Sequence, residues 1–261
     1  MTLDLVAILR SAWARLRADH VLLLPMAGLT MFLPQFGLLL LVEAPTLEKG
    51  DGSTAATAAQ AQVVLDWAVK NSGWYLAAYL CAFYGVLVIL SLYLDRRRPD
   101  LKTALGHAGR LLPRYLLSVV LVGLPVGLGI GLLGPVLGAA MVILLVPAFY
   151  WIVRTMLAGA VIVAERPIGA APAVRRSLAL TRGHGLVLAA LIAFVTFAGE
   201  LVAQIFVSLG ALMTAADAAN PIAMALVDGL AAIVQATAAL LLVLIQVEFY
   251  RRLSAGQAPA K

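Results

Sequence analysis

The chain has 261 residues, of which 63% are hydrophobic and only 12% are charged. A soluble domain carries about 25% charged residues, so this composition excludes an ordinary water-soluble enzyme, and it also excludes a disordered chain. The formal net charge is +6. The single cysteine, Cys81, excludes an internal disulfide framework and a zinc site built from several cysteines. The composition predicts an all-α polytopic membrane protein.

Six segments reach the roughly 20 apolar residues that a membrane-crossing helix needs. They are predicted at 21–42, 74–94, 115–134, 136–163, 186–211 and 222–249. The first is too long, and starts too far along the chain, for a cleaved signal peptide. Gly134 and Pro135 are expected to form the turn between the third and fourth spans. Four prolines inside spans predict kinks, at Pro25, Pro34, Pro125 and Pro147. The whole chain, 1–261, is expected to be one integral membrane domain.

Basic residues are concentrated in alternate loops. Sixteen of the 19 Lys and Arg lie before the first span, after the second, after the fourth and after the last. The positive-inside rule makes these segments cytoplasmic and predicts that both termini are in the cytoplasm. The opposite loop, 43–73, is long. Its residues Thr54–Lys70 are expected to form a separate helix that ends at Asn71–Gly73 and either rests on the surface or covers the outer mouth as a lid.

Each cytoplasmic basic segment also has the pattern of an amphipathic helix lying in the headgroup plane. These helices are predicted at 3–17, 100–112 and 171–182, with Pro172 in the first turn of the last and Gly183 just past its end. The chain can therefore be read as three units, 1–94, 95–164 and 165–253, each an interfacial helix followed by a membrane hairpin. The alternative is that basic helices preceding a membrane span simply share this pattern.

One segment carries a resemblance to a known family. A span ending Val161-Ile162-Val163-Ala164-Glu165 is followed by Ile168-Gly169, and then by the run from Arg175-Arg176-Ser177 to Leu180-Thr181-Arg182-Gly183. This segment resembles the YciC-like bacterial inner-membrane proteins and the related membrane domain of some glycerophosphodiester phosphodiesterases. The tail Tyr250–Leu253 is similar to their usual ending. The resemblance implies a bacterial inner-membrane location and envelope-associated work. It supplies no catalytic residue, since no catalytic barrel is attached.

The basic interfacial segments predict contacts with anionic phospholipids at the cytoplasmic surface. The residues expected to make them are Arg96, Arg97, Arg98, Arg110, Arg175, Arg176 and Arg182; the alternative is that these charges only set topology. The three histidines, His20, His107 and His184, are interpreted as interfacial surface residues. No nucleophile elbow, phosphate-binding loop or metal motif is present, so no cofactor, metal or nucleic-acid partner is expected.

Small residues recur at helical spacing in the third span. Gly123, Gly127 and Gly131 share one face, which would allow another helix to approach closely. Two interpretations remain open for this stripe: packing inside the bundle, or the seam of a homo-oligomer.

Two carboxylates fall deep inside predicted spans. Glu200 and Asp228 belong to the fifth and sixth spans, and depths measured from opposite membrane edges place them at one level. Gln204 and Gln235 extend this polar stripe. Arg154 is the available counter-charge, or alternatively pairs with Glu165 or Glu248. Intramembrane charges usually face a partner or a cavity, so this set is either a hydrogen-bonded clamp or a site for a proton, cation or polar substrate.

These observations favour a non-enzymatic, lipid-interacting protein of the bacterial inner membrane that serves envelope homeostasis or membrane organisation. The alternative is a small transporter or channel, coupled to protons through the intramembrane carboxylates. A membrane enzyme acting on lipids ranks third, because the sequence contains no visible catalytic constellation.

Overall fold

A computed structural model describes residues 4–43, 45, 54–95, 97, 99–137, 140, 142–215 and 220–255. Within these ranges every regular element is helical, and six helical segments are long and apolar enough to cross a membrane, which confirms the predicted all-α polytopic class. The elements are α1 Leu5–Ala18, α2 His20–Ala27, the π-helical turn η1 Gly28–Phe32, α3 Leu33–Leu41, α4 Thr54–Leu94, α5 Leu101–Leu137, α6 Val142–Thr155, α7 Ala158–Ala164, α8 Ala170–Leu180, α9 Gly185–Ala215 and α10 Pro221–Ala255.

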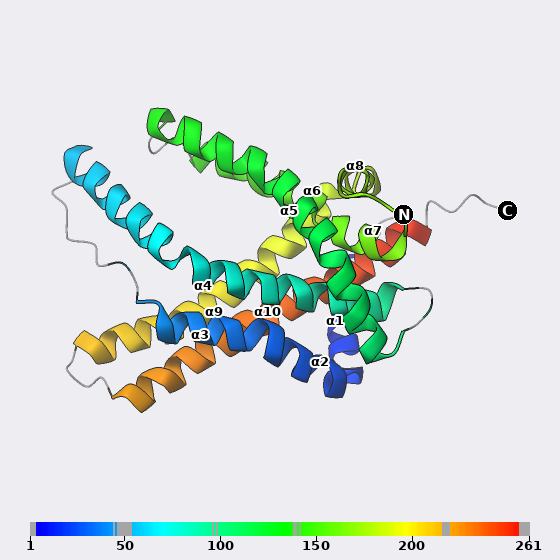
Figure 1. Ribbon diagram of the computed structural model, residues 1–261, viewed down its shortest axis with the longest axis horizontal. Coiled ribbons are helices and arrows are strands. Elements are labelled where there is room, and N and C mark those ends of the chain that lie inside the picture. Colours follow the sequence, from blue (N-terminus) through cyan, green and yellow to red (C-terminus); the bar gives the residue numbers. More distant parts are fainter. Residues whose placement is uncertain are drawn as a thin grey trace.

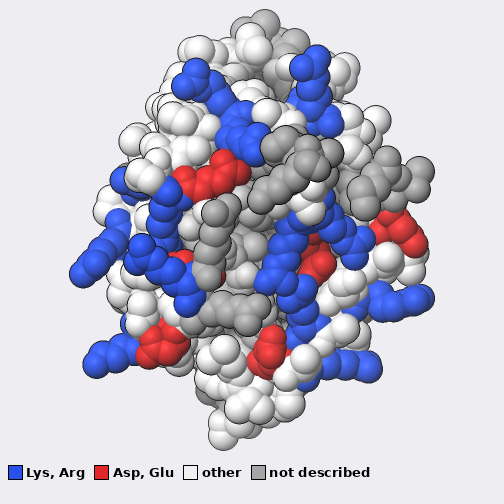
Figure 2. Space-filling model, turned by 90° about the vertical axis from the view of Figure 1, so that its right-hand side faces the viewer, with Lys and Arg blue, Asp and Glu red and all other residues white. Residues whose placement is uncertain are grey.

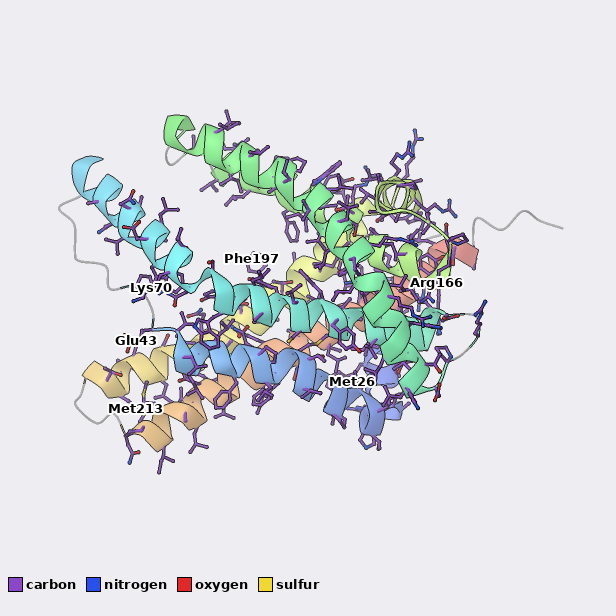
Figure 3. The ribbon with its side chains drawn as sticks, viewed as in Figure 1. Met26, Glu43, Lys70, Arg166, Phe197 and Met213 are labelled. Carbon is purple, nitrogen blue, oxygen red and sulfur yellow. The ribbon has the colours of Figure 1, made fainter. Side chains whose placement is uncertain are left out.

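The helices converge at one end of the molecule and spread apart toward the other (Figure 1). α1, α7, α8, the start of α5 and the end of α10 lie at the converging end, which we call the basic end. Figure 3 shows Arg166 at this end and Glu43, Lys70 and Met213 toward the opposite end. The polar, short elements of the fold are therefore gathered at a single end of the bundle.

The first span is interrupted by a π-helical turn. Pro25 lies inside α2 and removes a backbone donor there, and η1 follows directly before α3 resumes regular α-helix. The hydroxyl of Thr30 in this turn donates to the carbonyl of Met26 at 2.7 Å. A Cβ at Gly85 of α4 would lie only 2.1 Å from the Thr30 hydroxyl oxygen. Gly85 is therefore the residue that lets α4 pack against the irregular part of the first span.

Two predicted helix boundaries are wrong because helices continue through them. The segment expected to form a separate outer helix is the beginning of α4, which runs unbroken through Asn71–Gly73. With 41 residues α4 is roughly 60 Å long at 1.5 Å per residue, about twice the hydrocarbon thickness, so it extends well beyond the membrane core. The interfacial helix predicted at 100–112 is likewise the first part of α5, continuous with the third span.

The turn predicted at Gly134 and Pro135 is also displaced. α5 continues through both residues to Leu137, because a proline is compatible with helical backbone where neighbouring groups replace its missing donor. The fourth span, in contrast, is divided. α6 ends at Thr155 and α7 begins at Ala158, with the hydroxyl of Thr155 donating to the carbonyls of Trp151 and Ile152, each at 2.9 Å.

The start of α5 is fixed by a side-chain cap. The backbone N–H of Thr103 donates to the Asp100 carboxylate at 3.2 Å, and hydrogen bonds from Thr103 hold the pKa of Asp100 below its ordinary value. After α8, Gly183 adopts a positive φ of 82°, a conformation that glycine reaches without a Cβ clash, as expected for the residue that ends this helix.

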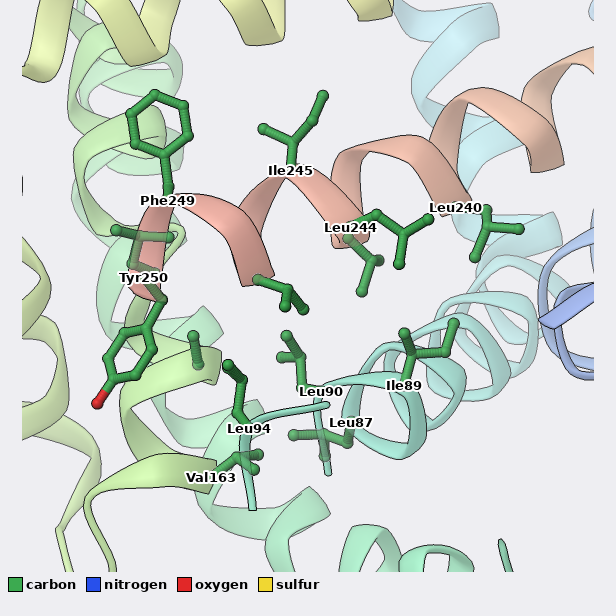
Figure 4. Packing of buried hydrophobic residues seen from close by; sticks show 14 of the residues in the cluster. Leu87, Ile89, Leu90, Leu94, Val163, Leu240, Leu244, Ile245, Phe249 and Tyr250 are labelled. Carbon is green, nitrogen blue, oxygen red and sulfur yellow. The ribbon is translucent and has the colours of Figure 1, made fainter. Parts of the chain in front are cut away.

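α10 forms the centre of the core. Its second half is buried on almost all sides and contacts α4, α7, α8 and α9. Figure 4 shows Leu240 and Leu244 of α10 on the side that faces Leu90 of α4, whereas Ile245 and Phe249 project from the opposite side of α10. The first half of α10 is more exposed, so the tightest packing of the protein lies near the basic end.

The apolar faces of α1 and α8 are covered by the bundle. Ile8 and Ala12 of α1 are fully buried, and α1 packs against α10. Ala173 and Ser177 of α8 are fully buried, and α8 packs against α7 and α5. These helices were predicted at the right places, but their apolar sides are used for packing within the protein as well as for any contact with the membrane.

Candidate functional site

A group of ion pairs links the elements of the basic end. Glu248 near the end of α10 has a side chain that is only 7% exposed, and it pairs with Arg15 of α1. Arg252, one turn further along α10, lies 3.8 Å from the other carboxylate oxygen. Arg252 also donates to the hydroxyl of Ser11 at 3.1 Å. α1 is thus attached to α10 by charge and by hydrogen bonding, as well as by its apolar face.

Two further carboxylates, like Glu248, lie at the basic end of a span. Asp95, which follows α4, lies 3.3 Å from the ring Nδ1 of His107 in α5 and 3.6 Å from the guanidinium of Arg166. Glu165, which follows α7, accepts from Arg176 of α8 at 3.2 Å. Glu165 also accepts a hydrogen bond from the hydroxyl of Tyr250 at 3.1 Å.

The three carboxylates follow one rule. Each lies at the basic end of an even-numbered span and pairs with a cationic or ionisable side chain on an amphipathic helix. Asp95 and Glu165 pair with the helix that comes next in the chain, and Glu248, the last, pairs with the first helix. The pairs therefore close a ring around the basic end. The division into three units remains a prediction, but this arrangement is what a repeated unit would produce. The sequence signal that could have revealed it is the acidic residue ending spans two, four and six.

Among the described residues, Arg154 forms no ion pair with a carboxylate. Its guanidinium donates to the carbonyl of Leu178 at 2.6 Å and to the hydroxyl of Thr181 at 3.2 Å. Its own carbonyl accepts from the hydroxyl of Ser177 at 2.7 Å. Glu165, Glu248 and the intramembrane carboxylates are therefore not the partners of Arg154. Arg154 ties the end of α6 to α8, because its guanidinium donates to a carbonyl and a hydroxyl at that neighbouring helix.

Several of the predicted lipid-contacting arginines are exposed on the basic end. Figure 2 shows Lys and Arg side chains spread across this face, with acidic side chains between them. Arg110, Arg175 and Arg182 are exposed and form no ion pair within the described part of the chain; we call these three the basic belt. Arg97 is also exposed, whereas Arg176 is engaged with Glu165. Arg96 and Arg98 lie outside the described residues.

The structure does not bring the predicted intramembrane polar residues together. Glu200 and Gln204 are exposed on α9, while Asp228 and Gln235 are half-buried on α10. Glu200 and Asp228 form no hydrogen bond or ion pair with one another or with other described residues. The side-chain oxygen of Gln235 is buried without a hydrogen-bond partner among the described residues.

The register of α9 and α10 explains this separation. A Cβ at Gly199 would lie 2.7 Å from that of Ala238, and a Cβ at Gly210 would lie 3.6 Å from a methyl group of Val227. In this register Glu200 and Asp228 are offset by about nine residues, roughly 13 Å along the helix axis. The sequence placed Glu200 and Asp228 at one level by measuring their depths from opposite membrane edges and assuming a core of about 30 Å. This assumption fails because α9, with 31 residues, is longer than the hydrocarbon core is thick.

The glycine stripe of the third span faces open space. No heavy atom of the described residues comes within 4 Å of a Cβ built on Gly123, Gly127 or Gly131, apart from their own local chain. Packing of this stripe inside the bundle, one of the two interpretations of the sequence, is therefore wrong for these glycines. Contact with a second copy of the chain remains a prediction.

The histidines differ in environment. His20 is exposed, as predicted for a surface histidine, whereas His107 and His184 are half-buried. His107 is drawn inward by its neighbour Asp95. Among the described residues, no group of three or more His, Cys, Asp or Glu side chains could hold a metal ion.

A groove with a volume of about 590 Å³ lies between α1, α9 and α10. Its walls are almost wholly apolar, with one charged residue, Arg10, in the lining. The lining residues are Val6, Leu9, Arg10 and Trp13 of α1, Phe194, Val195, Ala198, Gly199 and Val202 of α9, and Ile233, Val234, Thr237, Ala238 and Leu241 of α10. The sequence did not predict this groove, because it depends on how α1 crosses the α9–α10 hairpin.

Comparison with known proteins gives no match to a family model, a curated protein or a solved structure. The geometry itself therefore defines the protein as a multi-pass helical membrane protein with a ring of ion pairs, a basic belt and an apolar groove at one end.

Proposed function

We propose that this chain is a non-enzymatic protein of the bacterial inner membrane that interacts with anionic phospholipids through its basic end and serves envelope homeostasis or membrane organisation. Both termini would then be cytoplasmic. The resemblance of residues 161–184 to the YciC-like proteins supports the same location and role.

One observation carries the proposal: at the basic end the principal carboxylates are occupied internally, whereas the belt arginines are not. Asp95, Glu165 and Glu248 are paired within the bundle. The exposed guanidinium groups of Arg110, Arg175 and Arg182 have no carboxylate partner within the described segments. A surface with this balance is attracted to anionic headgroups, at roughly 1 kcal/mol for each basic side chain near the membrane surface.

The transporter alternative has less support. It requires a polar route that includes the intramembrane carboxylates, yet Glu200 and Asp228 lie at different levels. Neither residue lines the groove of α1, α9 and α10 or the smaller grooves beside α5, α6 and α9.

The proposal is tested by replacing the belt arginines Arg110, Arg175 and Arg182 together with Gln. The purified variant should carry several-fold less co-purified phosphatidylglycerol relative to phosphatidylethanolamine than the parent, because three surface cations are lost. The control is Lys70→Gln, an exposed cation toward the opposite end, which should leave the lipid ratio unchanged. An unchanged ratio in a folded triple variant would reject the proposed role of the belt.

A further inference from the structure

We propose that the groove of α1, α9 and α10 is a binding site for one anionic phospholipid of the leaflet next to the basic end, with the headgroup at Arg10 and an acyl chain in the apolar cleft. This inference rests on the proposed function, because it specifies one site for the lipid class to which the basic end is expected to bind.

The first argument is the depth of the groove. Along α9 its lining runs from Phe194 to Val202, and along α10 it runs from Leu241 to Ile233. Eight residues of helix correspond to roughly 12 Å, close to the 15 Å that one leaflet contributes to a hydrocarbon core of about 30 Å. The groove therefore has the depth that a single acyl chain requires, and it does not extend across the bilayer.

The second argument is the chemistry at the mouth. α1 contributes Arg10 and Trp13 to the same side of the groove. Arg10 is exposed and forms no ion pair or hydrogen bond within the described part of the chain. The guanidinium of Arg17 lies 5.4 Å from the centre of the Trp13 ring, which places a second cation beside the mouth. An aromatic ring and cations at the interfacial level are suited to a phosphate and its glycerol backbone.

The third argument is that the cleft is held open by the backbone. Gly199 and Ala238 bring α9 and α10 into close contact at its floor. α1 covers the cleft from the basic end and is anchored to α10 through Arg15 and Glu248. Because Gly199 and Ala238 form only the floor and the Arg15–Glu248 pair lies beside the groove, the apolar walls remain uncovered by the chain. An amphiphile with an anionic head and an apolar tail complements both the walls and the unpaired cation.

The test uses the full chain in detergent and native mass spectrometry with dioleoylphosphatidylglycerol, and with dioleoylphosphatidylcholine as the zwitterionic comparison. The parent should retain one phosphatidylglycerol at least fivefold more tightly than phosphatidylcholine. Arg10→Gln should lower the preference for phosphatidylglycerol over phosphatidylcholine about fivefold, which corresponds to about 1 kcal/mol. Arg10→Lys should keep most of it, because the charge remains.

A steric variant tests the apolar part of the site. Ala198→Trp would fill the cleft, and it should weaken retention of both lipids at least fivefold. The matched control is Ala190→Trp, an exposed position of α9 that does not line the groove, and it should retain lipid as the parent does. Thermal unfolding of each variant verifies that the bundle is intact.

Three results would overturn the inference: unchanged retention in Ala198→Trp, equal loss in Ala190→Trp, or conversion of a dimer to a monomer by Ala198→Trp. The last would identify a second copy of the chain as the occupant. The variant with all three belt arginines replaced separates failure of the groove site from failure of the proposed function. If this variant loses co-purified phosphatidylglycerol while Ala198→Trp retains the tightly held lipid, only the groove site is rejected. If only the groove variants lose lipid, the belt is rejected instead.

Discussion

Arg15 in the first helix and Glu248 in the last helix form an ion pair across 233 positions of the sequence. The Glu248 side chain is 7% exposed and that of Arg15 is 30% exposed, so the carboxylate is the more deeply buried partner. The pair joins the two ends of the chain and completes the ring of contacts at the basic end.

Replacing Glu248 with Gln should destabilise the protein by about 3 kcal/mol, the lower end of the cost of breaking a buried pair, because Arg15 keeps some access to water. For a chain of this size the loss corresponds to a decrease in Tm of roughly 6–12 °C. Thermal unfolding in detergent measures it. Glu43→Gln, at an exposed carboxylate toward the other end, should leave the Tm within about 1 °C. Equal Tm values for the two variants would show that the pair does not hold α1.

Gly85→Ala should destabilise the contact between α4 and the π-helical turn. The added Cβ would lie 2.1 Å from the hydroxyl oxygen of Thr30, and overpacking of this kind costs about 1–3 kcal/mol. Thr30→Ala should recover part of the loss, since it removes the nearest atom. Gly123→Ala provides the comparison: the space around it is open, so helix propensity alone should make it neutral or stabilising by up to about 1 kcal/mol. Chemical unfolding of the three variants would contradict this account if Gly85→Ala were as stable as Gly123→Ala.

Arg154→Ala should release α8 from the end of α6, because it removes the donors to Leu178 and Thr181. The readout is maleimide labelling of a cysteine at Val174, which is 8% exposed, in a chain with Cys81→Ser. Labelling should be slow with Arg154 present and at least several-fold faster without it. A cysteine at the exposed Ala179 should label at the same rate in both backgrounds. If Val174→Cys stays protected in the Arg154→Ala chain, the apolar face of α8 suffices to hold it.

Glu200→Gln and Asp228→Asn should have additive effects. Sites about 13 Å apart with no shared partner add within roughly 0.5 kcal/mol, so the stability of the double variant should equal the sum of the single changes. The same additivity is expected in any pH-dependent ligand effect. A coupling energy of 1 kcal/mol or more would instead show that the two carboxylates belong to one site, as the sequence suggested.

Cysteines replacing Ser53 and Ser254 should label from opposite sides of the membrane in a chain without Cys81. The prediction follows from the five spans that lie between these two positions, an odd number, and from the positive-inside rule, which puts Ser254 in the cytoplasm. Membrane-impermeant maleimide applied to intact spheroplasts should reach only the cysteine at position 53. Labelling of both from one side is the result that excludes this topology.

The six spans could be predicted because the hydropathy of each segment is a local property of the chain. The ends of α1 and α8 were also predictable, since Asp4 caps α1 through its carboxylate and Gly183 stops α8. The continuity of α4 through Asn71–Gly73 was not, because these residues weaken a helix without terminating it. Local sequence patterns therefore located the helices more reliably than they located the breaks between them.

The candidate site was less predictable, because it depends on contacts between distant segments. The neighbours of Arg154 were missed because its acceptors are a carbonyl and a hydroxyl on α8, which no charge pattern reveals. The level of Asp228 relative to Glu200 depends on the register of two helices, and that register is set by Gly199 and Gly210. The groove depends on the same register and on the position of α1, so no single segment contains its signal.

The closure of the ring between α1 and α10 constrains the order in which the protein is assembled. During synthesis α1 is made before its partner α10, and at 5–20 residues per second the roughly 200 residues between them take about 10–40 s. In this interval the apolar side of α1, with Ile8 and Ala12, lacks the helix against which it packs in the finished fold. A chain truncated before α10 would leave that face without this protein partner.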